Sequence, residues 1–85
     1  MEFFTYILQS EKDGTYYVGS SQNPADRLEK HNRKHNGYTA RKQPWKIVWV
    51  KSFVTKKEAL QMERLIKMKK SRSYIEILID NSLAG

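Results

Sequence analysis

The sequence contains no cysteine among its 85 residues, and this absence excludes disulfides, thiolate metal ligands and a cysteine nucleophile together. It also fits a reducing compartment. No apolar run near the N-terminus is long enough for a signal peptide or a membrane span, so we expect a cytoplasmic protein with no membrane contact. A chain of this length predicts a single domain that spans residues 1–85.

Negative charge is scarce as well. Nine Asp and Glu stand against 16 Lys and Arg, which gives a net charge of +7 and a pI of about 9.8. An excess of this size in a small domain predicts a polyanionic partner, with nucleic acid, DNA above all, as the leading candidate. A basic surface that serves only solubility would have the same composition. The basic residues are spread along the chain, which disfavours a membrane-surface role.

Three segments have the aromatic and β-branched composition of strands: residues 3–8, 15–19 and 45–53. The first two flank a polar turn that ends in Asp13-Gly14, a hairpin signal because Gly tolerates the positive φ of such turns. In the third strand, simple alternation places Ile47 and Trp49 on one face and Val48 on the other.

The first predicted helix begins at Asn23-Pro24. Asn can cap a free amide, and Pro suits the first helical position because its missing N–H has no partner there. We expect this helix to run from Pro24 to about Lys34 and to stop before Gly37, a residue that accepts the left-handed conformation.

Two capping boxes predict two further helices. Thr55 and Glu58 indicate a helix from Lys56 to about Lys70, and a box beginning at Ser73 indicates a short helix that ends near Asp80, with a fraying tail behind it. The element order is therefore β-β-α-β-α-α. It predicts an α+β fold in which three helices flank a three-stranded, mostly antiparallel sheet.

Glu63 is the most unusual single residue, because it falls inside the apolar stripe of the second helix formed by Ala59, Met62 and Ile66. A carboxylate there costs desolvation unless it is paired or binds a cation. Lys67, one turn later, offers an ordinary ion pair. The alternative is a hard divalent cation such as Mg²⁺, with water and a substrate phosphate as the remaining ligands.

Four other side chains could join Glu63 in one site. Tyr6 and Tyr17 lie in the middle of their strands, so a hairpin could bring both hydroxyls to one pocket, although strand tyrosines are common packing residues. Arg27 could clamp a phosphate through its planar fork, although most helix arginines are simply solvated. His31 lies one turn beyond Arg27 on the same side and could contact a phosphate or relay a proton.

A family resemblance rests on residues that occur in a fixed order along most of the chain: Thr5-Tyr6-Ile7, Tyr17-Val18-Gly19, Arg27, His31-Asn32, Tyr38-Thr39 and Glu63. This ordered set resembles the GIY-YIG nuclease domain. It is similar in particular to the small stand-alone branch related to the nuclease domain of the bacterial excision-repair incision subunit. Three positions depart from the pattern: Thr5 stands in place of Gly, Val18 stands in place of Ile, and Ser20 stands where some branches carry Lys.

The resemblance implies a DNA endonuclease, connected with DNA repair, that hydrolyses phosphodiester bonds with one Mg²⁺ or Mn²⁺. Tyr17 would then act as general base or position the water, with Tyr6 lining the same pocket. Arg27 would stabilise charge on the scissile phosphate, His31 would lie near the nucleophile or the phosphate, and Glu63 would hold the metal ion.

Nucleic acid is expected to bind around the loop after the first helix, through Lys34, Tyr38, Arg41, Lys42 and Lys46, with Trp45 as a further ring for stacking. A partner protein could choose the target. The alternative on the same fold is a nucleic-acid-binding module with little or no catalytic activity. A third interpretation treats Tyr6, Tyr17 and Glu63 as packing residues only.

Overall fold

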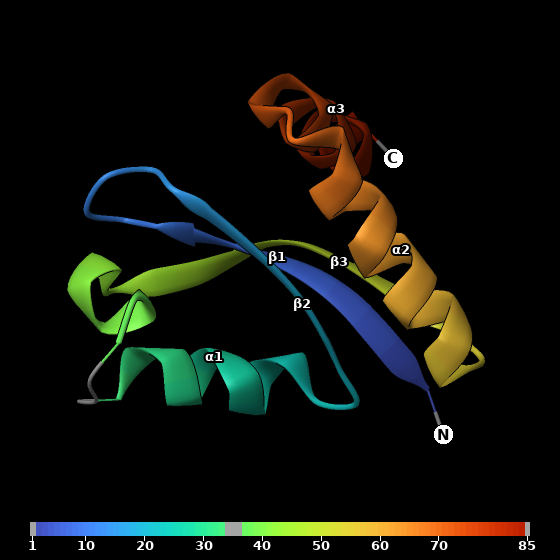
Figure 1. Cartoon of the computed structure of the whole chain (residues 1–85), viewed down its shortest axis with the longest axis horizontal. Helices are drawn as coiled ribbons and strands as arrows, with labels where there is room; N and C mark the ends of the chain where they lie inside the picture. The colour runs from blue at the N-terminus through green and yellow to red at the C-terminus, as the bar shows by residue number, and fades with distance from the viewer. Residues whose placement is uncertain (1, 34–36, 85) are drawn as a thin grey trace.

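The computed structural model describes residues 2–33 and 37–84 and confirms the predicted α+β fold and element order (Figure 1). The elements are β1 (Phe3–Ser10), β2 (Tyr16–Ser21), α1 (Pro24–Asn32), a 3₁₀ turn η1 (Thr39–Lys42), β3 (Trp45–Phe53), α2 (Lys56–Lys69) and α3 (Arg72–Ala84). Within these described residues no helix is long and apolar enough to cross a membrane. The expected end of the second strand moves from Gly19 to Ser21, because β2 stays paired with β1 for two residues more.

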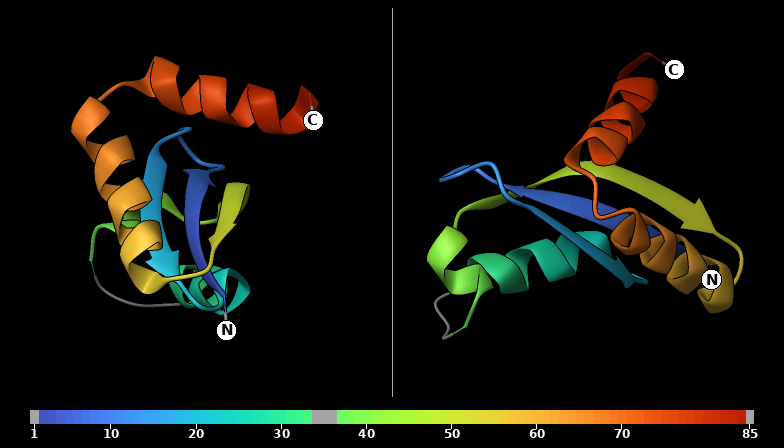
Figure 2. Two further views of the ribbon diagram at one scale, coloured as in Figure 1. Left: turned by 90° about the vertical axis from the view of Figure 1, so that its right-hand side faces the viewer. Right: turned by 45° about the horizontal axis from the view of Figure 1, so that its top comes forward.

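The sheet has the strand order β2-β1-β3, and both pairings are antiparallel. Helix α1 covers one face, here called the α1 face, and α2 and α3 cover the other, the α2–α3 face (Figures 1 and 2). The central strand β1 is buried on both sides. Tyr6 and Leu8 pack on the α1 face, and Ile7 packs on the α2–α3 face.

One predicted feature of β3 is wrong. A register shift between Ile7 and Leu8 pairs Ile7 with Trp49 but Leu8 with Ile47, so β3 carries one extra residue at this point. A β-bulge of this kind resets the alternation of side chains. Ile47 therefore packs on the α1 face and Trp49 on the α2–α3 face, although simple alternation placed them together.

The helix ends follow the predicted chemistry at two of three starts. Asn23 caps α1 by accepting the Asp26 amide, and the Thr55 hydroxyl caps α2 by accepting the Glu58 amide. Helix α3 starts earlier than expected, because its cap is Ser71 and not Ser73: the Ser71 hydroxyl accepts a hydrogen bond from the Tyr74 amide.

The far ends of two helices also differ from expectation. Helix α1 stops at Asn32, where Arg33 turns extended, so the positive φ of Gly37 lies beyond the helix and is not its stop signal. Helix α3 continues to Ala84 instead of fraying after Asp80.

The tip of the β1–β2 hairpin is fixed by α3. Arg72 donates to the Gly14 carbonyl at 3.1 Å, and its guanidinium lies 4.8 Å from the centroid of the Tyr16 ring. These contacts hold the strand that carries Tyr17 from the α2–α3 face.

Candidate active site

Tyr6 is the central residue of the candidate site, and its ring lies directly over Gly19 of the neighbouring strand. The two residues are register partners, and a Cβ added to Gly19 would lie only 2.6 Å from the Tyr6 hydroxyl and 2.7 Å from Cζ. Glycine is therefore required here by close approach. Because β2 is an edge strand, the phenol of Tyr6 passes over Gly19 toward the edge of the sheet.

Tyr17 lies on the same face as Tyr6 and belongs to a group of three rings. Its ring meets the His31 ring edge-on, with centroids 4.6 Å apart, and the Trp45 ring at 6.1 Å. Such edge-to-face contacts fix the orientation of a ring. Helix α1 thus contributes His31, and β3 contributes Trp45, to the placement of the half-buried Tyr17.

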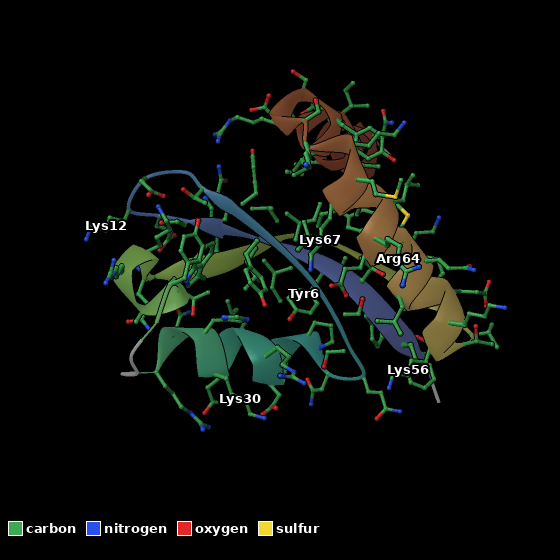
Figure 3. The ribbon with its side chains drawn as sticks, viewed as in Figure 1. Tyr6, Lys12, Lys30, Lys56, Arg64 and Lys67 are labelled. Carbon is green, nitrogen blue, oxygen red and sulfur yellow. The ribbon has the colours of Figure 1, made fainter. Side chains whose placement is uncertain are left out.

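Glu63 reaches this region from α2. Its side chain is only 20% exposed, and its carboxylate accepts a hydrogen bond from Lys67 Nζ at 2.6 Å. The ion pair predicted as the ordinary interpretation of Glu63 is therefore present. Figure 3 shows Lys67 on the side of α2 that faces Tyr6.

The electrostatic environment of Tyr6 connects four of the predicted site residues. Burial raises the pKa of Tyr6 to about 12, and the nearby Tyr17 and Glu63 add to this rise while Arg27 opposes it. Charges act on a pKa in this way only from close by. The pKa of this one buried phenol is therefore affected by Tyr17 from β2, Arg27 from α1 and Glu63 from α2.

Arg27 itself is exposed on α1, and within the described part of the chain it forms no ion pair. An unpaired guanidinium near the Tyr6 phenol is free to bind an anion, and its fork matches the oxygens of a phosphate. The site thus combines an anion-binding cation, two hydroxyls and a carboxylate, which is a set suited to a phosphodiester.

The Glu63 carboxylate is the acidic group that acts on Tyr6. Among the residues that the structure describes, no three His, Asp or Glu side chains are grouped as a protein-only metal site. One carboxylate is compatible with Mg²⁺, which keeps several waters and takes substrate phosphate oxygens as ligands. The ion would have to displace the Lys67 ammonium from Glu63.

Three of the predicted nucleic-acid-binding residues, Tyr38, Arg41 and Lys42, lie together around η1, with the Lys42 ammonium 5.4 Å from the centroid of the Tyr38 ring. Tyr38 and Arg41 are exposed on and beside η1. The ammonium of Lys42 is held in an ion pair with Asp13, which raises the pKa of Lys42. Lys46 lies between Trp45 and Ile47, which both pack on the α1 face, so alternation turns Lys46 to the opposite face. Lys34 is outside the described residues.

Sequence reasoning missed two hydroxyls that position α2. Thr5 Oγ1 donates to the Ala59 carbonyl at 2.6 Å, and Ser20 Oγ donates to the same carbonyl at 3.3 Å. Ala59 lies one helical turn before Glu63, so these bonds join the turn that carries the carboxylate to β1 and β2. Both hydroxyls stand at positions that depart from the family pattern, and this departure is the signal in the sequence that could have pointed to them.

Asn32 is a third residue whose role becomes clear only in the structure. Its side-chain amide accepts from the Trp45 amide at 2.7 Å and donates to the Trp45 carbonyl at 3.0 Å. This pair of hydrogen bonds fastens the end of α1 to the start of β3. It thereby fixes His31, the preceding residue, against Tyr17.

Residues 2–75 match the model of the GIY-YIG catalytic domain. The chain therefore belongs to this family, and its predicted family assignment is confirmed.

Several proteins are similar to this chain. A UPF0213 protein of Streptococcus pneumoniae is 35% identical over 79 residues, which cover 92% of this chain and 79% of that protein. The structure-specific endonuclease subunit slx1 of Schizosaccharomyces japonicus is 42% identical over 69 residues, which cover 74% of this chain and 25% of that protein. The solution structure of a UPF0213 protein from Bacillus halodurans superimposes with a TM-score of 0.59 at 28% identity and covers 94% of this chain and 84% of that one.

Proposed function

We propose that this protein is a metal-dependent endonuclease that hydrolyses phosphodiester bonds of DNA at the site around Tyr6. The observation that carries the proposal is the environment of this buried phenol, which senses Tyr17, Arg27 and Glu63 from three different elements. Membership of a family described as a catalytic domain supports the proposal, as does the name of the fungal endonuclease relatives.

The two tyrosines would have different roles. With a pKa of about 12, Tyr6 keeps its proton at neutral pH, so its hydroxyl can donate a hydrogen bond, for example to a phosphate oxygen, but is poorly suited to act as a base. That leaves Tyr17 to orient the attacking water or accept its proton. The edge contact with His31 would hold the Tyr17 hydroxyl in place for this task.

Arg27 would bind the scissile phosphate and stabilise the charge that builds on its oxygens as the water attacks. Preorganised cations at developing charge are the main source of catalysis in phosphoryl transfer. Glu63 would hold one Mg²⁺ or Mn²⁺, and the ion would supply further charge neutralisation. Lys67 would release Glu63 when the ion binds.

The test is nicking of supercoiled plasmid by the purified chain with Mg²⁺ or Mn²⁺. We expect Tyr17→Phe, Arg27→Ala and Glu63→Gln each to lower the rate by about 100-fold or more, the usual effect of removing one transition-state contact. Cleavage that survives both Tyr17→Phe and Glu63→Gln would reject the proposed site.

One control lies on the same strand as Tyr17, and the other lies on α3, away from the helix that carries Glu63. Tyr16 neighbours Tyr17 on β2 but packs on the α2–α3 face, so Tyr16→Phe should keep the activity. Glu76 is an exposed, ion-paired glutamate of α3, so Glu76→Gln should also keep it. Circular dichroism of each variant separates loss of chemistry from loss of fold.

The second candidate is a nucleic-acid-binding module without turnover. The specific observation in its favour is the Lys67 ammonium, which occupies the Glu63 carboxylate. This candidate predicts salt-dependent DNA binding that persists in Glu63→Ala, with no cleavage at any metal concentration. If Glu63 were only a packing residue, Glu63→Leu would stabilise the fold.

A partner protein for targeting also belongs to the proposal. The fungal relatives are named as subunits of a structure-specific endonuclease, and this chain corresponds to about a quarter or less of their lengths: 25% and 18% for two of them. Pull-down of DNA-bound complexes from cells, with Glu63→Gln to trap the substrate, would test this part.

A further inference from the structure

A hollow of about 470 Å³ lies next to the candidate site, between the end of β2, the first turns of α1 and the start of α2. We call it the α1–α2 hollow. Arg27 is one of its lining residues and also acts on Tyr6, so the hollow adjoins the candidate site. Its volume is within the range of pockets that hold small ligands.

The walls of the α1–α2 hollow carry an excess of positive charge. Arg27, Lys30 and Lys56 line it, against a single carboxylate, Asp26. Asp26 is ion-paired with Lys30 at 3.3 Å. Within the described residues Arg27 and Lys56 have no carboxylate partner, so two cations from two helices face one cavity without being neutralised. Figure 3 shows Lys30 on α1 and Lys56 at the start of α2.

The remaining lining residues include both polar and apolar side chains, a combination that suits a nucleotide. The hydroxyls of Ser20 and Ser21 supply neutral polar groups, whereas Phe3 and Leu60 form an apolar part of the wall. Leu60 is 43% exposed, so folding alone does not use its side chain fully. Phosphate suits the cations, and a sugar or base suits the apolar side chains.

We propose that the α1–α2 hollow binds the nucleotide adjacent to the scissile phosphate, with the neighbouring phosphate between Arg27 and Lys56 and the sugar or base against Leu60. The inference rests on the proposed function, because Arg27 serves both positions. It moves the main track of the nucleic acid strand away from the loop around η1 and places it across the start of α2.

The test is binding of a fluorescent DNA duplex, measured by anisotropy in EDTA so that no cleavage occurs. Lys56→Gln should weaken binding about 3- to 10-fold and reduce the slope of log K against log salt by about 0.9, the value for one lost phosphate contact on duplex DNA. Lys57→Gln is the matched control. It makes the same charge change one residue later, outside the lining of the hollow.

A second pair of variants tests the apolar wall. Leu60 and Leu65 lie on the same helix and are 43% and 42% exposed, but only Leu60 lines the hollow. Leu60→Ser should weaken DNA binding at least about 3-fold without changing the salt slope, because no phosphate contact is lost. Leu65→Ser should leave the affinity unchanged. Equal effects within either pair would overturn the inference.

The outcomes separate this inference from the nuclease proposal. If plasmid nicking requires Glu63 but neither nicking nor DNA binding changes in the Lys56 and Leu60 variants, the nuclease proposal is kept and DNA binding in the hollow is rejected. If DNA binding depends on Lys56 and Leu60 but no nicking occurs, DNA binding in the hollow is kept and the nuclease proposal is rejected. Binding of mononucleotide or inorganic phosphate that depends on Lys56, together with a duplex affinity that does not depend on Lys56 or Leu60, would assign the hollow to a free ligand and overturn its role in strand binding.

Discussion

Replacing Gly19 with Ala tests the geometry of the site at its tightest point. The added Cβ would lie 2.6 Å from the Tyr6 hydroxyl, whereas ordinary contact begins at 3.4 Å, so the ring or the strand must move by about 0.8 Å. Tyr6 is 3% exposed and packs with Leu8 and Trp45, so its ring has little room. Overpacking of this kind typically costs about 1–3 kcal/mol.

The two terms of this substitution have opposite signs. In a strand, Ala gains about 0.5–1 kcal/mol over Gly from the smaller entropy loss of its backbone. The contact penalty is larger, so we expect Gly19→Ala to destabilise the protein by about 1–2 kcal/mol. Nicking activity should also fall, because the displaced phenol no longer lies beside Tyr17 and Glu63.

Urea unfolding, followed by tryptophan fluorescence, measures this change directly. For a domain of this size the slope is about 1 kcal/mol/M, so the midpoint should drop by about 1–2 M. A shorter side chain at the partner position should relieve the clash, so Tyr6→Leu and Gly19→Ala should show a favourable coupling of about 1 kcal/mol or more in a double-mutant cycle. A Gly19→Ala protein as stable and as active as the parent would refute the reasoning.

Three further predictions follow from other contacts of the site. Thr5→Val removes the buried hydrogen bond to Ala59 and should lower the free energy of unfolding in urea by about 1–3 kcal/mol. It should also weaken the response of nicking to Mn²⁺. Thr5→Ser keeps the hydroxyl and should keep most of the stability and of the Mn²⁺ response. Lys67→Gln frees Glu63 from a competing cation, so half-maximal nicking should need less Mn²⁺; an unchanged requirement would contradict metal binding there. In an alkaline absorbance titration, one phenol should ionise near pH 12 and be absent from Tyr6→Phe. Its raised pKa contributes stability that is complete below about pH 10 and is lost as the pH rises toward 12.

Local signals in the sequence were sufficient for most of the fold. Asp13-Gly14 specifies the hairpin, and β3 runs from Trp45 to Phe53 as its composition predicts. Asn23 and Thr55 cap their helices as expected, because the cap is decided by groups within three residues. The pairing of strands far apart in the sequence could not be predicted from local signals. The bulge in β3 depends on how β1 and β3 fit together, and its effect on Ile47 and Trp49 had no local signal.

The candidate site shows the same division. Residue chemistry made Tyr6, Tyr17, Arg27 and Glu63 candidates and the family resemblance implied their roles, and in the structure the other three act on the Tyr6 phenol. Charge alone could not show which lysines are available to bind nucleic acid, because this depends on partners that only the structure reveals. Lys42 turned out to be paired with Asp13, whereas Lys56, which the sequence did not single out, faces the α1–α2 hollow.

Anomalous diffraction from crystals soaked in Mn²⁺ tests the central claim most directly, namely that Glu63 serves a metal-dependent phosphodiester site beside the two tyrosines. We expect one anomalous peak next to the Glu63 carboxylate in the parent protein and none there in Glu63→Gln. Crystals of active protein that show no peak beside Glu63, or a peak only at a distant carboxylate such as Glu76, would contradict it.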